Sequence, residues 1–335
     1  MIKKKTVDQI RSRRKFLQGG LALGAMTPLV LANQAHAHGS RLTDNKDQEF
    51  VIVSIVATHP FWNDLKNGAQ DAADDLGVKF TYVGPAGFDI EGQVQAMEQI
   101  IIKSPAGIGH VHSTDAAYPS IQKALDAGIP VMAVTSTGAN TPCLGYIGSN
   151  EQNVGKVMAK GVISLLGDSG KIAVSTVPAQ DNLNDRIAGL KAGLEGTSIE
   201  IVATGDNKGD DSETAATTSA ILLANPDLDA VVCINATGSG VAAALKETGK
   251  VGKVKAVVAD TLAPILDAVE DGTVDLTVAQ KIYMQGYLLM QMLYARANPT
   301  PTIQGFLDGG LNPLPTNCDT GCDLVDKGSA KLFRS

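Results

Sequence analysis

The sequence predicts an α/β fold built from two similar lobes, each of them a doubly wound parallel sheet. From Phe50 onward, short β-branched runs alternate with longer segments whose apolar residues recur every three or four positions. Such alternation is typical of βαβ units, in which parallel strands carry helices on both faces of the sheet. The alternation runs through two series of similar length and rhythm, divided near residue 150. About ten strands is a large number for one open sheet, so we expect two lobes.

The first series begins with the apolar run 50–57, which has the length and β-branched content of a buried strand. Pro60 favours the first turn of a helix, because it has no N–H to leave unpaired there and its φ is already helical. In the helix that follows, Phe61, Leu65 and Ala69 share one face, and Gly77 ends it. The series continues with predicted strands at 78–84, 107–112 and 130–135 and helices at 93–103 and 116–127.

The second series repeats this rhythm from about residue 150 to residue 297. Helices are predicted at 150–166, 183–194, 213–224, 238–248, 263–270 and 283–297, and strands at 171–177, 199–204, 230–234, 254–259 and 274–279. The tail after Asn298 is rich in Pro, Gly, Asn and Thr, and we expect it to wrap across the surface or the join between the lobes.

The first 37 residues are predicted to be a secretory signal peptide of the twin-arginine type. The segment SRRKFL at 12–17 follows a basic start, and a weakly apolar run extends over 19–32. Small residues at 35 and 37 then stand where a signal peptidase cuts. The run is interrupted by Pro28 and is shorter than the about 20 residues that a membrane-spanning helix needs. We therefore expect export to the periplasm by the twin-arginine route.

The negative net charge of the chain indicates which kinds of partner it can bind. The net charge is −7 at pH 7, and removal of the basic leader makes the remainder more acidic. A surface that binds the phosphates of nucleic acid needs the opposite sign, so we expect no nucleic-acid partner. No second stretch of about 18 apolar residues follows the leader, so we expect a soluble product, and we expect it to be a monomer.

Four cysteines are present, at positions 143, 233, 318 and 322. Export permits disulfides, and Cys318 and Cys322 are near enough in sequence to bridge locally. A local disulfide and two free thiols are equally compatible with this spacing. A zinc site would need further ligands, and no histidine lies near this pair in the sequence. Cys233 lies in an apolar strand and is expected to be an inert core residue.

Polar and aromatic side chains follow the predicted strands, at the edge where open parallel sheets bind their ligands. They comprise two aromatic rings, two imidazoles, several amides, one guanidinium and one carboxylate. Flat rings stack on the C–H faces of a sugar, while amides, Asp and Arg hydrogen-bond to its hydroxyl groups. The candidate ligand-binding residues are His59, Phe61, Trp62, His112, Thr135, Asn182, Arg186, Asn235, Asp260 and Gln280.

Several of these residues also have a purely structural interpretation. Phe61 has the spacing of the core-facing stripe of its helix, whereas Trp62 lies off that stripe and is the ring that we expect to contact a ligand. Helix capping is the alternative role for His59. Arg186 could be a surface helix residue, and Asp260 could cap the segment that follows it. The repetition of such residues at strand ends across both series favours a binding cleft.

Other chemistries find weaker support. The chain has neither a GxGxxG nor a GxxxxGK[ST] loop to hold phosphates, and no GxSxG nucleophile turn. His110 and His112 share one face of a strand, but two ligands are too few for a metal site. Asp210 and Asp211 are adjacent, point apart if extended, and make a poor acid–base pair. We therefore expect no metal, no cofactor and no enzymatic activity; an exported cofactor- or metal-dependent enzyme is the alternative.

Several motifs, in their order and spacing, give the chain its resemblance to a known family. They are HPFW at 59–62 before an Ala-rich amphipathic helix, AGIPV at 127–131, YIGSN at 146–150, NDRIAGL at 184–190, AVVCIN at 230–235 and DGT at 271–273. With them the chain resembles the periplasmic sugar-binding proteins of the ribose-binding type, the solute receptors of ABC transporters. The resemblance extends from about Phe50 to Ala297, which is most of the exported chain.

The resemblance implies a type I periplasmic binding protein fold, with two lobes joined by three crossings and closing on a monosaccharide. It places the crossings near 148–150, 279–281 and 310–313. The lobes would then comprise residues 48–149 plus 281–311 and residues 150–280 plus 312–335. The family's stacking aromatics match Phe61 and Trp62, and its polar contacts match His59, His112, Arg186, Asn235, Asp260 and Gln280.

The chain departs from the family pattern in its first lobe. Ribose-type members carry an Asp-Arg pair where this chain has Thr135 and Ser136, and an Asn where His59 stands. They also carry an aromatic residue near the position of Asp210, and the segment 318–322 is not part of the usual pattern. The departures make another pentose, a hexose, a deoxysugar or a sugar alcohol at least as good a candidate as ribose.

The sequence thus predicts an exported solute-binding protein of an ABC importer. It would bind a monosaccharide or sugar alcohol between its lobes and deliver it to permease subunits in the inner membrane by domain closure. A sugar sensor for a chemoreceptor, using the same closed surface, is a further alternative.

Overall fold

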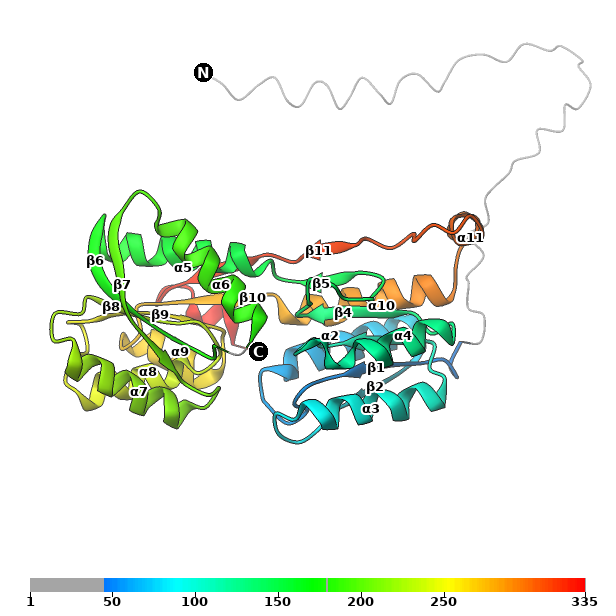
Figure 1. Cartoon of the computed structure of the whole chain (residues 1–335), viewed down its shortest axis with the longest axis horizontal. Helices are drawn as coiled ribbons and strands as arrows, with labels where there is room; N and C mark the ends of the chain where they lie inside the picture. Colours follow the sequence, from blue (N-terminus) through cyan, green and yellow to red (C-terminus); the bar gives the residue numbers. More distant parts are fainter. Residues whose placement is uncertain (1–44, 179, 335) are drawn as a thin grey trace, which may run out of the picture. The chain divides into compact units, whose positions relative to one another are not determined.

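The computed structural model describes residues 45–178 and 180–334 and confirms the predicted α/β fold. Within these residues the strands form two six-stranded sheets, one in each lobe (Figure 1). Their orders are β11-β5-β4-β3-β1-β2 and β12-β10-β9-β8-β6-β7. All the neighbouring strands are parallel except β12, which runs antiparallel to β10. The predicted signal peptide lies outside the described residues.

The two sheets have the same strand order when the strands of each lobe are counted along the chain. The N-terminal lobe contains β1 (Glu49–Val53), α2 (Trp62–Leu76), β2 (Lys79–Val83), α3 (Ile90–Lys103), β3 (Gly107–His110), α4 (Tyr118–Asp126), β4 (Val131–Thr135), β5 (Tyr146–Gly148), α10 (Ile282–Ala297), α11 (Pro301–Asp308) and β11 (Asn317–Asp319). The C-terminal lobe contains α5 (Glu151–Leu166), β6 (Ser169–Thr176), α6 (Asp181–Leu194), β7 (Ser198–Asp206), α7 (Asp211–Ala224), β8 (Ala230–Cys233), α8 (Gly238–Glu247), β9 (Lys255–Ala259), α9 (Ala263–Asp271), β10 (Leu276–Gln280) and β12 (Cys322–Val325).

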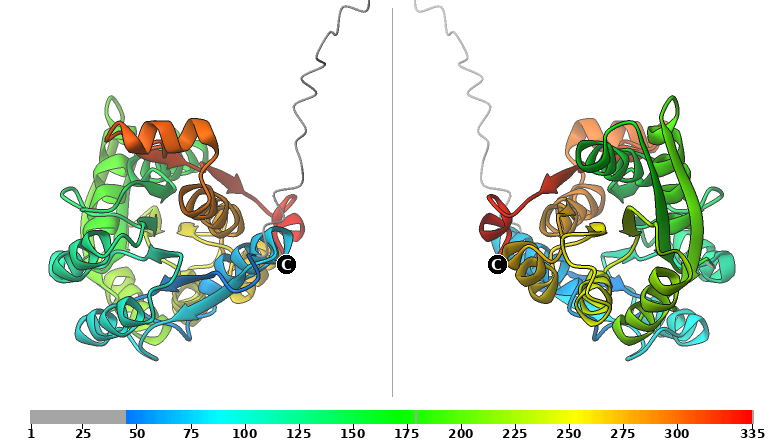
Figure 2. Two further views of the ribbon diagram at one scale, coloured as in Figure 1. Left: turned by 90° about the vertical axis from the view of Figure 1, so that its right-hand side faces the viewer. Right: turned by 90° about the vertical axis from the view of Figure 1, so that its left-hand side faces the viewer.

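The sheet of the N-terminal lobe is covered on both faces, and successive side chains of a strand point to opposite sides of it. Phe50 and Ile52 of β1 pack with α2 and α10, whereas Val51 and Val53 pack with α3 and α4. The further views show helices on both sides of the sheets (Figure 2). The near-continuous apolar sequence of β1 is therefore the pattern of a strand that is buried on both faces.

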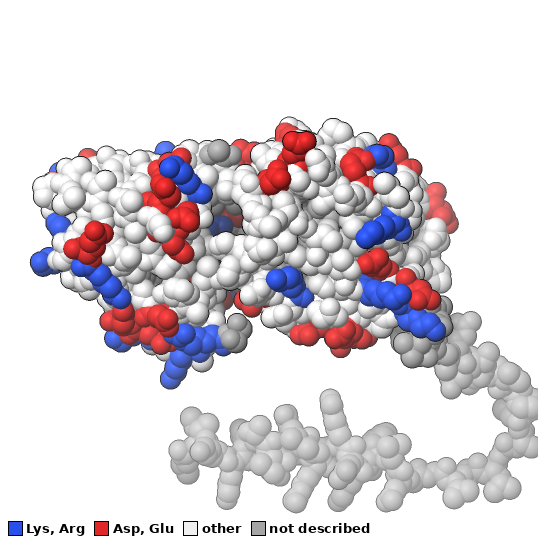
Figure 3. All heavy atoms as spheres, turned by 90° about the horizontal axis from the view of Figure 1, so that it is seen from below, with Lys and Arg blue, Asp and Glu red and all other residues white. Residues whose placement is uncertain are grey.

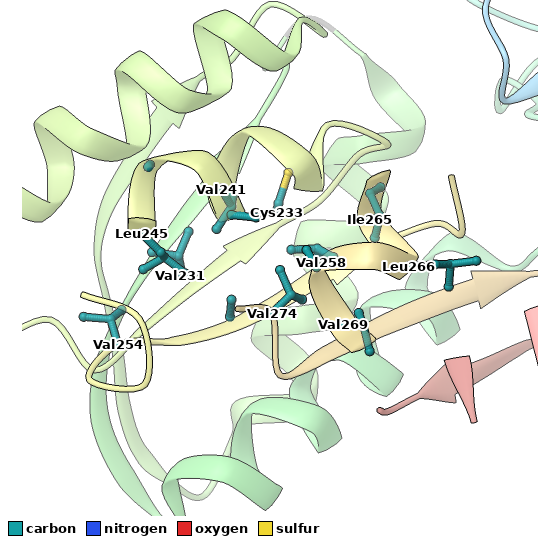
Figure 4. Close-up of a cluster of buried hydrophobic side chains, with 14 of the residues drawn as sticks. Val231, Cys233, Val241, Leu245, Val254, Val258, Ile265, Leu266, Val269 and Val274 are labelled. Atoms are coloured by element: carbon teal, nitrogen blue, oxygen red, sulfur yellow. The ribbon is translucent and has the colours of Figure 1, made fainter. Parts of the chain in front are cut away.

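The C-terminal lobe is built in the same way. Its first cluster joins α5 and α6 to one face of the sheet, through residues such as Met158 and Leu190. Its second cluster joins α7, α8 and α9 to the other face (Figure 4). Cys233 is fully buried in this second cluster, as predicted for a core residue.

Three crossings join the lobes, and a buried amide ties them together. The chain crosses between β5 and α5, between β10 and α10, and between β11 and β12. Gln285, fully buried in α10, donates from Nε2 to Ser149 Oγ of the first crossing (3.3 Å) and to Thr320 Oγ1 of the third (3.2 Å). Gln285 thus connects α10, the helix that follows the second crossing, to the first and third crossings.

The third crossing lies later in the chain than the resemblance placed it. Residues 317–319 still pair with β5 of the N-terminal sheet, and residues 322–325 pair with β10 of the C-terminal sheet. The crossing therefore falls at residues 320–321 and not near 310–313, and the boundary placed after residue 311 shifts with it. In sequence, the segments that form β11 and β12 resemble a loop, because these strands are only three and four residues long and contain polar residues.

The alternative of a Cys318–Cys322 disulfide is not realised in this structure, where both are free thiols. Cys318 packs against the core of the N-terminal lobe, and Cys322 packs against the core of the C-terminal lobe. The two residues are close in sequence, but they belong to strands of different sheets on either side of the third crossing.

Reciprocal glycines let one pair of helices approach closely in each lobe. Gly68 and Gly286 lie where α2 meets α10, and Gly155 and Gly189 lie where α5 meets α6. A Cβ added at any of the four would lie 1.9 to 2.1 Å from backbone oxygen of the facing helix. No side chain can rotate away to relieve such a contact, so these helix crossings require glycine.

We expect Gly155→Ala to lower the free energy of unfolding by about 1–3 kcal/mol, the usual cost of overpacking. Its Cβ would lie 1.9 Å from the carbonyl oxygen of Arg186, so α6 would have to move. Urea titration measures the effect. Gly305→Ala is the matched control, since Gly305 is exposed in α11 with open space around it and alanine should stabilise there by about 0.5–1 kcal/mol. Equal effects at both positions would contradict the packing argument.

The surface carries charges of both signs. On the face shown in Figure 3, acidic and basic side chains are interspersed among uncharged ones. Exposed ion pairs such as Lys171–Asp227 and Lys246–Asp271 join neighbouring elements. Pairs of this kind contribute little to stability because water screens them. Among the described residues, no helix has both the length and the apolar character that crossing a membrane requires.

Candidate functional site

A cavity of about 580 Å³ is lined by residues of both lobes, at the ends of the parallel strands. All of the predicted ligand-binding residues line it. From the N-terminal lobe come His59, Phe61, Trp62, His112 and Thr135, and from the C-terminal lobe come Asn182, Arg186, Asn235, Asp260 and Gln280. The placement follows the rule that open parallel sheets bind ligands beyond the carboxyl ends of their strands.

The two aromatic rings differ from expectation in their degree of burial. Trp62 is 7% exposed and belongs to the hydrophobic core of its lobe, whereas Phe61 is only partly buried. Their rings meet edge to face with centroids 4.7 Å apart, and both line the cavity. The sequence predicted that Phe61 faces the core because of its helical spacing. The helix begins only at Trp62, so Phe61 lies one residue before it. Each ring thus combines packing with exposure to the cavity.

His59 is oriented by the turn that starts α2. The backbone N–H of Phe61 donates to Nδ1 of His59 at 3.2 Å. Neutral imidazole carries a proton on one nitrogen only, so an accepting Nδ1 places the proton on Nε2. His59 thus accepts a hydrogen bond at the start of α2 through Nδ1, and its ring lines the cavity.

Two buried side chains of the N-terminal wall have polar atoms with no hydrogen-bond partner among the described residues. They are the hydroxyl of Thr135 and both ring nitrogens of His112, and the two residues are each 6% exposed. Asp115 is the nearest acid to His112, with its carboxylate 4.0 Å from Nε2. Ser136 also lines the cavity, but its hydroxyl donates to the carbonyl of His112 at 2.5 Å. Since buried polar groups are normally paired, these groups suit a ligand that supplies the missing partners.

Thr135 ends β4 and Asp260 directly follows β9, equivalent places in the two sheets, and the two residues share an unusual backbone. Their φ angles are +66° and +73°, in the left-handed region that residues other than glycine rarely adopt. In each lobe a hydroxyl of the neighbouring strand holds the carbonyl of this residue. Tyr146 Oη donates to Thr135 O at 3.0 Å, and Thr277 Oγ1 donates to Asp260 O at 2.6 Å. In both lobes, a left-handed residue with its carbonyl held by a hydroxyl group therefore lines the cavity.

Arg186 is held by a buried ion pair that the sequence did not reveal. Its Nε and Nη2 donate to Oε2 of Glu151 at 2.8 and 2.6 Å, and its Nη1 donates to the carbonyl of Ile234 at 2.7 Å. Burial opposes the charge on Arg186, but the carboxylate of Glu151 raises its pKa above the ordinary value. The guanidinium has five N–H bonds, so two remain for a ligand.

Glu151 itself lines the cavity, at the first turn of α5 directly after the first crossing. It follows a crossing and not a predicted strand, so the search at strand ends missed it. An acidic residue in the first turn also has a helix-capping explanation, which gives it no distinctive signal in sequence.

Amide groups orient the remaining polar residues of the C-terminal wall. Gln280 Nε2 donates to Asp260 Oδ1 at 3.0 Å, which leaves Gln280 Oε1 without a partner among the described residues. Asn207, fully buried, donates to Asn235 Oδ1 at 2.7 Å and accepts from its Nδ2 at 3.2 Å. Asn207 follows β7 and was not among the predicted residues; it orients Asn235 from behind. Asn182 lies in the first turn of α6, half-buried.

The electrostatics of the cavity favour neutral imidazole on one wall. Burial lowers the pKa of His112, although the nearby carboxylates of Asp115 and Asp181 oppose this. Burial raises the pKa of Asp260, and Arg186 and Gln280 oppose that shift. Within the part of the chain that the structure describes, no group of three or more His, Cys, Asp or Glu side chains is arranged to hold a metal ion.

The buried histidines should make stability depend on pH. Burial lowers the pKa of His110 to about 3, whereas an unfolded chain takes up this proton near pH 6.5. The unfolded state therefore binds more protons between these values, so stability falls as the pH drops below 6.5. Between pH 7 and pH 5, His110 should account for a loss of about 2 kcal/mol.

Denaturant titrations of His110→Gln and the unchanged protein at both pH values test this. We expect the variant to lose less stability between pH 7 and pH 5, by about 2 kcal/mol. Because each protein is compared with itself at two pH values, any direct cost of the substitution cancels. If Gln at this position prevents folding, His110→Leu provides the same comparison. An unchanged pH dependence in the variant would contradict the prediction.

Comparison with known proteins gives consistent results. The family model described as periplasmic binding protein domain matches residues 50–300. The chain is 28% identical over 304 residues to the xylose/arabinose-binding protein of Sulfolobus acidocaldarius, covering 85% of this chain and 72% of that protein. It is 27% identical over 273 residues to the D-allose-binding periplasmic protein of Escherichia coli, covering 77% and 84%.

Solved structures share the two-lobed fold. An arabinose-binding protein from Geobacillus stearothermophilus is 29% identical with a TM-score of 0.77, over 86% of this chain and all of that one. An ABC transporter solute-binding protein from Burkholderia graminis, in complex with D-arabinose, is 28% identical with a TM-score of 0.79, over 86% and 98%. The resemblance to the ribose-binding type is thereby confirmed, and the chain belongs to the periplasmic binding protein family.

Proposed function

We propose that this protein is the exported solute receptor of an ABC importer and that it binds a monosaccharide or sugar alcohol in the cavity between its lobes. One observation carries the proposal: hydrogen-bonding groups without partners among the described residues face this cavity from both lobes, beside two aromatic rings. A polyhydroxylated ring supplies both kinds of contact, hydroxyl groups for the former and C–H faces for the latter. The relatives named above bind xylose, arabinose or allose by name, which supports the same ligand class.

Each wall would make a different contribution to binding. Asp260 and Gln280 Oε1 are acceptors and require hydroxyl donors, whereas Arg186 and His59 Nε2 are donors. His112 and Thr135 can donate or accept. Phe61 and Trp62 would cover a C–H face of the ring. We propose that all the predicted residues, Asn182 and Asn235 included, contact the ligand directly or through water.

Ligand contacts from both lobes provide the physical basis for closure. A ligand that touches both walls binds more tightly when they approach, so it shifts the population toward the closed form. The three crossings would act as the hinge. We propose that inner-membrane permease subunits recognise the closed monomer in the periplasm, and that the chain reaches it through the twin-arginine signal of residues 1–37. No bond is made or broken in this role, so no catalytic residue is assigned.

A thermal-shift screen of the purified protein, followed by calorimetric titration of any hit, tests the proposal. The panel contains pentoses, hexoses, deoxysugars and sugar alcohols, with nucleotides and divalent metals as competing classes. A ligand that binds only the native state raises the melting temperature, by about 2.7 kcal/mol of stability at a hundredfold excess over its dissociation constant. We expect a sugar or polyol to do so. A shift with a nucleotide or a metal, but with no sugar or polyol, would overturn the proposal.

A further inference from the structure

The cavity has a polar half and, at its other end, a group of apolar side chains. Thr135 and Gln280 end strands β4 and β10, and Asp260 follows β9. These strands lie near the sheet edges that the crossings join. At the opposite end, Val56, Phe88 and Ile90 lie beyond β1 and β2, and Val177 lies beyond β6. We call these last four residues the apolar half. Polar residues also line that end: His59 lies beyond β1, Asn182 lies beyond β6, and Lys208 lies beyond β7, where its ammonium group pairs with Glu213 at 3.0 Å.

The apolar half is continuous because two loops of the N-terminal lobe are joined. The N–H of Ala57 donates to the carbonyl of Pro85 at 2.7 Å, and the hydroxyl of Thr58 donates to the carbonyl of Ala86 at 2.6 Å. These bonds hold the loop that carries Val56 beside the loop that carries Phe88. Ile90 follows in the first turn of α3, whose start is capped by Asp89. The side chains of Val56, Phe88 and Ile90 then line the cavity from adjoining loops.

Phe88 is the residue of this half that most needs an explanation. Its ring is 58% exposed, although it stands at a cavity whose other end is rich in polar groups. An exposed large apolar side chain beside further apolar residues is typical of a surface that something covers. The polar half already contains the groups that suit hydroxyls, so the part of a ligand that reaches Phe88 differs in chemistry from the part that reaches Asp260.

We propose that the ligand is a sugar ring that carries an apolar substituent, such as the methyl group of a deoxysugar or the alkyl group of a glycoside. The ring occupies the polar half, and the substituent lies in the apolar half against Val56, Phe88, Ile90 and Val177. The inference rests on the proposed sugar-binding function and adds the class of substituent. Burial of the carbon that a methyl glycoside adds to its parent is expected to strengthen binding about fourfold. A 6-deoxy sugar adds no carbon, and it gains affinity because no hydroxyl group has to be buried among apolar side chains.

Calorimetric titration of the full exported chain with matched sets of sugars tests the inference. Each set contains a hexose, its 6-deoxy analogue, and the two methyl glycosides of that hexose. In the set that binds, we expect at least one substituted member to bind about fourfold or more tightly than its parent. If no member of any set binds but a pentose or sugar alcohol binds in the thermal-shift screen, the sugar-binding function stands and this inference is overturned. If no sugar or polyol binds in either experiment, the sugar-binding function itself fails. If parents bind and no substituted sugar gains affinity, that function stands and this inference is overturned.

Two variants locate the substituent. Phe88→Ser removes the exposed ring from the apolar half, and Phe306→Ser removes a comparably exposed ring, 46%, from α11 outside the cavity. The readout is the ratio of the affinities for the substituted sugar and its parent. We expect Phe88→Ser to bring this ratio close to one and Phe306→Ser to leave it as in the unchanged protein. A ratio that Phe88→Ser does not alter would overturn the placement.

Discussion

Replacement of Glu151 by alanine is expected to lower the free energy of unfolding by about 3–5 kcal/mol and to remove ligand binding. Arg186 is 3% exposed, and Glu151 accepts hydrogen bonds from both its Nε and its Nη2. Without the carboxylate, the guanidinium would be a buried charge that keeps only its bond to the carbonyl of Ile234. It would have to leave the cavity or recruit water, and in either case its two free N–H bonds lose their direction.

A double variant separates stability from binding. In Glu151→Leu/Arg186→Met the charge and its partner are both replaced by apolar side chains of similar length, and such replacements are often neutral or stabilising. We expect this variant to recover most of the stability lost in Glu151→Ala, by urea titration, while sugar binding stays absent. Recovery of binding as well would show that the guanidinium is not a ligand contact. Little destabilisation in Glu151→Ala would show that the pair is not needed to hold α5 and α6.

Replacement of Asp260 by asparagine is expected to weaken ligand binding by about 30- to 1,000-fold, which corresponds to about 2–4 kcal/mol. Hydroxyl groups that donate to a buried carboxylate form charge-assisted hydrogen bonds, and an amide oxygen accepts more weakly. Asparagine is the cleanest substitution, because it tolerates the left-handed backbone of this position, where φ is +73°. Alanine would add backbone strain and confuse the two effects.

Titration calorimetry measures the change, and Asp227→Asn serves as the control. That substitution removes the same charge from an exposed ion pair with Lys171, outside the cavity, and should leave affinity as it is. The melting temperature without ligand should be similar in both variants and in the unchanged protein. An affinity of Asp260→Asn equal to that of the control would exclude Asp260 as a ligand contact.

Much of the fold could be predicted because its signals are local. The runs around β1 and β9 are apolar on both faces, as strands in a doubly covered parallel sheet must be, and Gly77 marks the end of α2. The site residues could be predicted for a related reason. Parallel strands bring their carboxyl ends to one edge of their sheet, so residues as far apart in sequence as His59 and Thr135 were expected at one edge, and both line the cavity.

The features that escaped prediction depend on contacts between distant segments. Glu151 is significant only because Arg186 of another helix lies against it, and Asn207 only because it pairs with the amide of Asn235. The strands β11 and β12 are short and polar, and they are ordered by pairing with β5 and β10. Trp62 is buried because α2 packs on the sheet, although its place in the helical period suggested otherwise.

The sequence by itself determined the alternation of strands and helices, the division into two lobes and the edge at which polar and aromatic side chains gather, because each depends on the order of residues along the chain. Only the tertiary structure decided how Arg186 is held, that Cys318 and Cys322 lie on different sheets, and that the cavity has an apolar half around Phe88. The physical reason is that hydrogen bonding, burial and charge pairing act through space, between residues whose separation along the chain carries no signal of their contact.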